Sequence, residues 1–158
     1  IETMLSFDTG MIGFPLRLLA REVYDKVISK VGQNKVALIT GEEKIIPSTA
    51  NFFICTVESM PKNKKVDFIA IDEIQMCADR ERGHIFTERL LEARGTELTM
   101  FLGSQVMANI IKELVENVYL AAHKALKEIE ELRNAEVYTL YWEAGLSLTL
   151  AYVINFSI

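Results

Sequence analysis

The residues most suggestive of chemistry are two adjacent carboxylates, Asp72 and Glu73, which directly follow the apolar run VDFIAI at 66–71. Carboxylates are costly to place at the end of a buried strand unless they bind something. A magnesium ion that carries nucleotide phosphates is one such ligand: one carboxylate orients the metal or its waters, and the next accepts a proton from the attacking water. The structural alternative is that Asp72 caps the following turn while Glu73 is exposed. The local sequence pattern alone does not favour either interpretation of Asp72 and Glu73.

Polar residues also follow the other apolar runs of the sequence. In an open α/β sheet, ligands bind beyond the carboxyl ends of the strands, where helix N-termini point their amides outward. Thr40, Gly41 and Thr56 can offer hydroxyls and amides to a phosphate backbone, and Arg17 can pair with a phosphate. Each signal is weak alone, because Thr and Gly at strand ends are mostly turn residues. The lysine cluster at 62–65 is usually a solvated loop.

Several kinds of site are disfavoured by the sequence. No G-x-x-x-x-G-K-[ST] phosphate loop occurs, and no glycine is followed by lysine. His84 and His123 have no neighbour at metal-ligand spacing, and neither Cys55 nor Cys77 carries the local pattern of a nucleophile. The second half of a nucleotide site is therefore predicted without the half that grips the phosphates.

The elements that must position these residues alternate in type, which predicts an α/β fold with a mostly parallel sheet and flanking helices. Pro15 is expected to open a helix that Gly32 ends, with Leu16 on its apolar stripe. A second helix is predicted at 84–94 before Gly95, and a long one from Gln105 to about Arg133. The predicted strands are 10–14, 35–40, 51–56, 66–71 and 97–102.

Composition bounds the remaining choices. Half of the residues are apolar and the net charge is -5, so one buried core is expected and any nucleic-acid contact must be local. The first residues lack a secretory signal, and the cysteines are predicted to be reduced, which favours a cytosolic or organelle-matrix compartment. The apolar residues 144–158 are shorter than a bilayer requires, so a membrane span is the disfavoured interpretation.

The order of several short motifs resembles one helicase family. The motifs are FPLRLLAREV, LITGEE, CTVESM, FIAIDEIQM and FLGSQ, and together they cover about 4–115. The chain resembles the mitochondrial degradosome RNA helicases of the Suv-three type and their alphaproteobacterial relatives. These are superfamily-two helicases with two RecA-like domains, so the resemblance implies a partial first RecA-like domain at 1–116. Residues 117–158 match nothing in that family and are predicted to form a divergent tail.

The resemblance also implies roles for individual residues. Asp72 would hold magnesium with the nucleotide, Glu73 would bind the nucleotide and act as catalytic base, and Gln75 would couple hydrolysis to strand separation. The residues implied to couple hydrolysis to unwinding are Gly103, Ser104 and Gln105. Those implied to contact nucleic acid are Pro15, Leu16, Arg17, Thr40, Gly41, Glu42, Thr56 and Val57.

The implied cofactors are ATP and Mg²⁺, and the implied substrate is RNA, with DNA or hybrid duplexes as further candidates. An exoribonuclease partner and a place in RNA turnover follow from the same resemblance, as does a location in the bacterial cytoplasm, favoured here, or the mitochondrial matrix. The phosphate loop, the central strand before it and the second motor domain are lacking, so we expect a fragment that hydrolyses no ATP alone. The alternative is a non-enzymatic RNA-binding or interaction remnant. A lost middle strand is expected to leave a gap in the sheet, which residues 137–158 are a candidate to fill.

Overall fold

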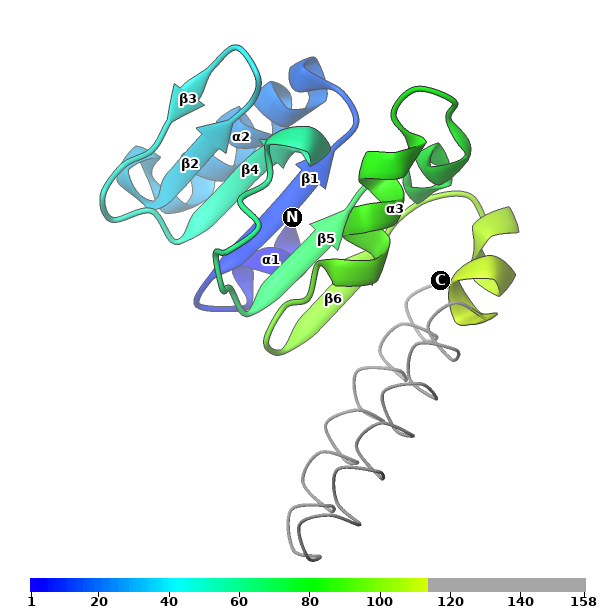
Figure 1. Ribbon diagram of the computed structural model, residues 1–158. Helices are drawn as coiled ribbons and strands as arrows, with labels where there is room; N and C mark the ends of the chain where they lie inside the picture. The colour runs from blue at the N-terminus through cyan, green and yellow to red at the C-terminus, as the bar shows by residue number, and fades with distance from the viewer. Residues whose placement is uncertain (114–158) are drawn as a thin grey trace, which may run out of the picture. The chain divides into compact units, whose positions relative to one another are not determined.

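The computed structural model describes residues 1–113 and divides the chain into two compact units, residues 1–104 and 105–158. The first unit is built on a six-stranded sheet with the order β3-β2-β4-β1-β5-β6 (Figure 1). Neighbouring strands are parallel except for β3, which pairs antiparallel with β2 at one edge. The predicted α/β class with a mostly parallel sheet is confirmed.

The five predicted strands are present, each within two residues of its expected ends. They are β1 (Gly10–Phe14), β2 (Val36–Ile39), β4 (Phe52–Thr56), β5 (Phe68–Ile71) and β6 (Leu98–Phe101). Strand β3 (Lys44–Ile45) was not predicted, because two residues carry no periodicity that can be detected in a sequence. The α-helices are α1 (Glu2–Leu5), α2 (Arg17–Val31) and α3 (Gly83–Glu92), and the short 3-10 helices are η1 (Gln33–Lys35), η2 (Val57–Ser59) and η3 (Ile74–Ala78).

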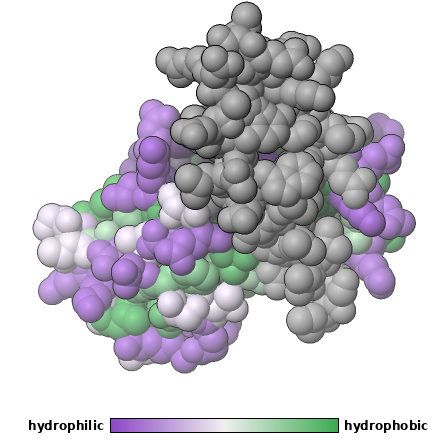
Figure 2. Space-filling model, turned by 90° about the horizontal axis from the view of Figure 1, so that it is seen from below, coloured by the Kyte–Doolittle hydropathy of each residue, from purple (hydrophilic) through white to green (hydrophobic). Residues whose placement is uncertain are grey.

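Helix α2 covers one face of the sheet, lying against β1, β2 and β4, while α3 lies over the opposite face near β5 (Figure 1). Alternate residues of each strand, such as Ile12 and Ile54, enter the core under α2. Because every residue of β1 and β4 is buried, each strand contributes hydrophobic stabilisation on both faces, about 1.5–3 kcal/mol for each large side chain. The described part of the surface seen in Figure 2 mixes hydrophilic and hydrophobic residues, as is usual for folded domains.

The start of α2 differs from the prediction. The helix begins at Arg17 rather than at Pro15, and Leu16 is its N-cap with an extended backbone. The side chain of Leu16 therefore precedes the first turn and is 60% exposed instead of joining the apolar stripe. Tyr24 on the same helix is fully buried in the core. The predicted end is confirmed, since Gly32 caps the helix with φ +90°.

Helix α3 fastens the segment that follows β4. The buried guanidinium of Arg89 donates hydrogen bonds to the carbonyls of Val57 at 3.3 Å and Met60 at 2.9 Å. Met60 in turn fills the space over Gly13, where an added Cβ would lie 2.3 Å from its sulfur. Both cysteines are free thiols, and burial raises the pKa of Cys55 to about 12. The helix ends at Glu92, two residues before the predicted end.

The prediction that the sheet has a gap is wrong for the described strands. Strand β1 is hydrogen-bonded to β4 on one side and to β5 on the other, so the strands run without interruption from β3 to β6. The candidate filler at 137–158 lies outside the described residues, as does the predicted boundary at 116/117, which stays a prediction.

The described part of the second unit is helical at 106–113, in agreement with a helix beginning near Gln105. The predicted continuation to about Arg133 lies outside the described residues. Among the helices of residues 1–113, none is long and apolar enough to cross a membrane.

Asp67 links the loops at the amino-terminal ends of the strands, the side of the sheet away from Asp72 and Glu73. Its carboxylate accepts hydrogen bonds from the amide and the hydroxyl of Thr9, at 3.0 and 2.6 Å, and from the hydroxyl of Thr96 at 3.0 Å. These bonds favour the charged form, chiefly the one from the Thr9 hydroxyl, and hold the pKa of Asp67 below its ordinary value of 3.8. The loop before β1 and the loop before β6 are thereby joined to the start of β5.

We predict that Asp67→Asn lowers the free energy of unfolding at neutral pH, and that the difference from wild type shrinks in acid. Because the folded-state pKa is lowered, the contribution of Asp67 is present above about pH 4 and is lost as the pH falls through the folded-state pKa. Urea unfolding between pH 7 and pH 2.5 measures it. The control is Asp8→Asn at an exposed position; a deficit of Asp67→Asn that stays constant down to pH 2.5 contradicts the prediction.

Candidate functional site

Asp72 and Glu73 lie where the sequence predicted, directly after the buried strand β5. The Asp72 amide donates to the Gly13 carbonyl at 2.9 Å, which continues the hydrogen bonding between β5 and β1 by one residue. The Asp72 carboxylate accepts the Glu73 amide at 3.0 Å. The following helix η3 has Glu73 as its N-cap, with no side-chain cap hydrogen bond, and Glu73 is half-buried, so the structural alternative of a capping Asp72 beside an exposed Glu73 is not what the structure has. Burial raises the pKa of half-buried Asp72, the charge of Glu73 adds to this effect, and the hydrogen bond from the Glu73 amide opposes it.

Glu73 has a left-handed backbone, with φ 55° and ψ 47°. It is the only non-glycine residue of the described chain with positive φ. This conformation costs roughly 1–2 kcal/mol for an L-residue and is found mostly where the surroundings enforce it. It turns the chain sharply from β5 into η3, and the Gln75 side-chain amide then donates a hydrogen bond to the Glu73 carboxylate.

Gln75 joins this acidic turn to the loop after β6. Its side-chain oxygen accepts the Ser104 amide at 3.0 Å, while its side-chain nitrogen donates to Glu73. The Ile74 amide donates to the Leu102 carbonyl at 2.9 Å, which fixes the two loops side by side. We call the hydrogen-bonded series Glu73–Gln75–Ser104 the relay. Gln105, also predicted as a coupling residue, belongs to the second unit.

Gly103 is required by the relay for steric reasons. A Cβ at this position would lie 2.3 Å from the Gln75 side-chain oxygen and 3.0 Å from the Ile74 backbone nitrogen. Its φ is not in the positive range, so close approach and not backbone conformation explains the glycine. The structure thus brings Gly103 and Ser104 into contact with the acidic turn.

The donor set of the acidic turn fits a magnesium ion with phosphate ligands. Within residues 1–113, no lysine or arginine forms an ion pair with Asp72 or Glu73. The same part of the chain contains no cluster of three or more His, Cys, Asp or Glu that could hold a metal alone. Mg²⁺ commonly takes one or two carboxylates and completes its shell with water and substrate phosphates, so two acids suffice for that ion.

Ionic and hydrogen-bonded contacts tie the segment after β1 to its neighbours. The Pro15 carbonyl accepts a hydrogen bond from Arg82 at 2.6 Å, and Arg82 also pairs with Glu58 at 2.5 Å. Arg17 forms an ion pair with Glu42, and both side chains are mostly exposed. Arg82 was missed by sequence reasoning, because its two partners lie 67 and 24 residues away along the chain.

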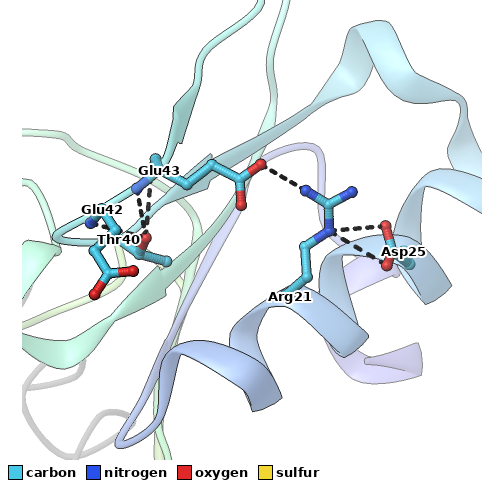
Figure 3. A network of polar contacts seen from close by, with 5 residues as sticks. All are labelled: Arg21, Asp25, Thr40, Glu42 and Glu43. Atoms are coloured by element: carbon cyan, nitrogen blue, oxygen red, sulfur yellow. Dashed lines mark hydrogen bonds and ion pairs between the residues drawn. The ribbon is translucent and has the colours of Figure 1, made fainter.

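The Thr40 hydroxyl is used inside its own turn. It accepts the Glu43 amide at 2.9 Å and donates to the Glu43 carbonyl at 3.2 Å, and the side chain is almost fully buried (Figure 3). Thr56 is buried as well, with its hydroxyl donating to Ser59 at 3.0 Å, and Val57 is fully buried. Among the eight residues predicted to contact nucleic acid, the exposed ones are Leu16, Arg17, Gly41 and Glu42.

The amino-acid sequence of the chain is similar to those of known proteins. Residues 1–134 match the family described as the DEXQ-box helicase domain of Suv3. The chain is 36% identical over 121 residues to the mitochondrial ATP-dependent RNA helicase SUV3 of Saccharomyces paradoxus. The aligned region covers 73% of the chain and 16% of the relative. The SUV3 helicase of Candida albicans is 40% identical over 115 residues, covering 68% of the chain and 15% of the relative. The SUPV3L1 helicase of Gallus gallus is 32% identical over 143 residues, covering 85% and 18%. The chain therefore spans less than a fifth of the length of these relatives.

We predict that Gly103→Ala destabilises the fold by about 1–3 kcal/mol, because the new methyl group must displace Gln75 or the backbone of Ile74. Urea unfolding measures the change. The matched control is Gly41→Ala, where an added Cβ meets nothing within 4 Å and the expected effect is below about 0.5 kcal/mol. Equal stabilities for the two variants contradict the packing described for Gly103.

Proposed function

The chain belongs to the family of the DEXQ-box helicase domain of Suv3, and from this membership we propose that it serves as part of an ATP-dependent RNA helicase. The observation that carries the proposal is the acidic turn after β5, joined through Gln75 to the loop after β6. The relatives in yeast, Candida and chicken are named ATP-dependent RNA helicases, which supports the same activity.

On the nucleotide side, we propose that Asp72 holds Mg²⁺ with ATP and that Glu73 accepts the proton of the attacking water. The ion supplies charge neutralisation for the phosphates when bound. Glu73 binds the same nucleotide, and its carboxylate is oriented by the Gln75 amide. The backbone of Asp72 is hydrogen-bonded to β1 through its amide, whereas the carboxylate of Glu73 is positioned by the Gln75 side chain. The two acids are therefore held by different parts of the fold.

The relay gives this proposal a route from the nucleotide to a second loop. A change in the charge or position of the Glu73 carboxylate alters its hydrogen bond from Gln75, and Gln75 also holds the Ser104 amide. Gly103 and Ser104 are therefore proposed as coupling residues, and Gln105 is proposed as a third from the family resemblance alone. Both side-chain hydrogen bonds of this route are lost when Gln75 is replaced, so the route can be interrupted by one substitution.

On the nucleic-acid side, we propose that Pro15, Leu16, Arg17 and Gly41 lie along the RNA backbone, with the segments of Thr40, Thr56 and Val57 contributing backbone groups. DNA or hybrid duplexes are further proposed substrates. An exoribonuclease partner is proposed from the family resemblance alone. The mitochondrial names of the relatives support a mitochondrial location over the bacterial cytoplasm.

A second candidate function is RNA binding without hydrolysis by these 158 residues alone. It is favoured by one observation: the sequence holds no G-x-x-x-x-G-K-[ST] motif to grip the nucleotide phosphates. Under this candidate, RNA affinity depends on salt but not on ATP. An ATPase assay on the 158-residue chain is expected to show no turnover under either candidate, since phosphoryl transfer needs the phosphate cradle as well.

We predict that Mn²⁺, a paramagnetic substitute for Mg²⁺ with the same preference for oxygen ligands, broadens the backbone amide signals of residues 71–75 in NMR spectra of the 158-residue chain. Asp72→Asn is expected to remove this broadening, because the metal-binding carboxylate is lost. Asp25→Asn, which makes the same charge change at an exposed position on α2, is expected to leave it unchanged. Broadening that survives in Asp72→Asn, or that centres on another carboxylate, contradicts the assignment.

A further inference from the structure

The N-terminal half of α2 and the 40–43 turn carry opposite charges that face each other. Arg17 pairs with Glu42, and Arg21, one helical turn further along, pairs with Glu43 at 2.6 Å. Arg21 also pairs with Asp25 at 3.3 Å, so its guanidinium lies between two carboxylates (Figure 3). Both arginines of this helix face are therefore already engaged by carboxylates.

The turn that presents the two glutamates is held in place. The Thr40 amide donates to the Glu43 carbonyl at 2.8 Å, and the Thr40 hydroxyl bonds both the amide and the carbonyl of Glu43. The next pair of residues, Ile39 and Lys44, is in antiparallel register between β2 and β3. Glu42 is thus carried by a tight hairpin turn and does not reach Arg17 by chance from a long loop.

We propose that Glu42 is a competitor for the RNA-binding arginine and not an RNA contact: its carboxylate occupies the Arg17 guanidinium, and an RNA phosphate must displace it. This inference rests on the proposed RNA-backbone role of Arg17. Carboxylates and phosphates bind guanidinium groups in the same planar, charge-assisted geometry, so they are alternatives for one site. The backbone phosphate is the chemical group recognised, without regard to base sequence.

The exposure of the pair makes this exchange feasible. The Arg17 and Glu42 side chains are 57% and 73% exposed, so their ion pair is solvated and weak enough for a polyanion to break. Once Arg17 has turned to a phosphate, the Glu42 carboxylate remains nearby as a like charge. RNA affinity is then reduced both by the exchange and by repulsion, and Glu42 sets how tightly this part of the chain holds the backbone.

The test measures binding of the 158-residue chain to two probes, a fluorescent single-stranded RNA and inorganic polyphosphate, at several salt concentrations. Glu42→Gln is expected to tighten binding of both probes about two- to fivefold at low salt, the range expected for an exposed ion pair. The salt dependence is expected to steepen, by about 0.7 in log–log slope for each additional phosphate that the chain neutralises on a single strand. In the Arg17→Gln background, Glu42→Gln is expected to have no more effect than the control substitution.

The matched control is Glu22→Gln. It removes the same charge from an exposed ion pair with Lys26 on α2, the helix that also carries Arg17. Tightening by Glu42→Gln no greater than that by Glu22→Gln, weaker binding, or tightening that persists in Arg17→Gln overturns the proposal. Binding of neither probe by any variant also overturns it. If polyphosphate responds as expected but RNA binds no variant, Glu42 competes with phosphate groups for Arg17, and it is the proposed RNA-backbone role of Arg17 that fails.

Discussion

The candidate site depends on the hydrogen bonding of β5, which is paired in parallel with β1 on one side and β6 on the other. A strand paired on both sides and buried on both faces cannot shift or rotate without breaking many backbone hydrogen bonds. The bond from the Asp72 amide to the Gly13 carbonyl extends this rigidity to the first acidic residue. The cost of placing a carboxylate at this point is visible in the raised pKa of Asp72, whose main cause is burial.

The left-handed backbone at Glu73 is the second constraint, and it connects the sheet to the relay. Without that turn, η3 would leave β5 in another direction and Gln75 would not reach both Glu73 and Ser104. The close approach at Gly103 shows that the loop after β6 is packed tightly against Gln75. A polar side chain that is bonded at both ends, inside a close-packed contact, can transmit a change at one end to the other. The same geometry gives the proposed coupling role a physical basis.

The five parallel strands could be predicted because each is a largely apolar run between turn residues, and parallel connectivity then places their carboxyl ends at one rim. The sequence also located Asp72, Glu73 and Gln75 correctly after β5. It could not predict the backbone of Glu73, because positive φ is expected of glycine and not of glutamate. The ion pair of Arg17 and Glu42 and the bonds of Arg82 join residues far apart in sequence, where only the folded chain shows which charges meet. The error about Leu16 has a local cause: one residue decides whether a side chain precedes a helix or joins its face, and helix ends are set by capping geometry.

Gln75 physically joins the acidic turn to the loop after β6, and hydrogen exchange of the Ser104 amide reports on this connection. In Gln75→Met, which keeps the length of the side chain but removes its hydrogen-bonding groups, the Ser104 amide is predicted to exchange roughly fivefold faster, as expected for the loss of about 1 kcal/mol. The Leu102 amide, bonded to the Ile71 carbonyl at 2.9 Å, is predicted to keep its rate. An unchanged Ser104 rate, or equal acceleration of Leu102, would mean that Gln75 does not hold the two loops together.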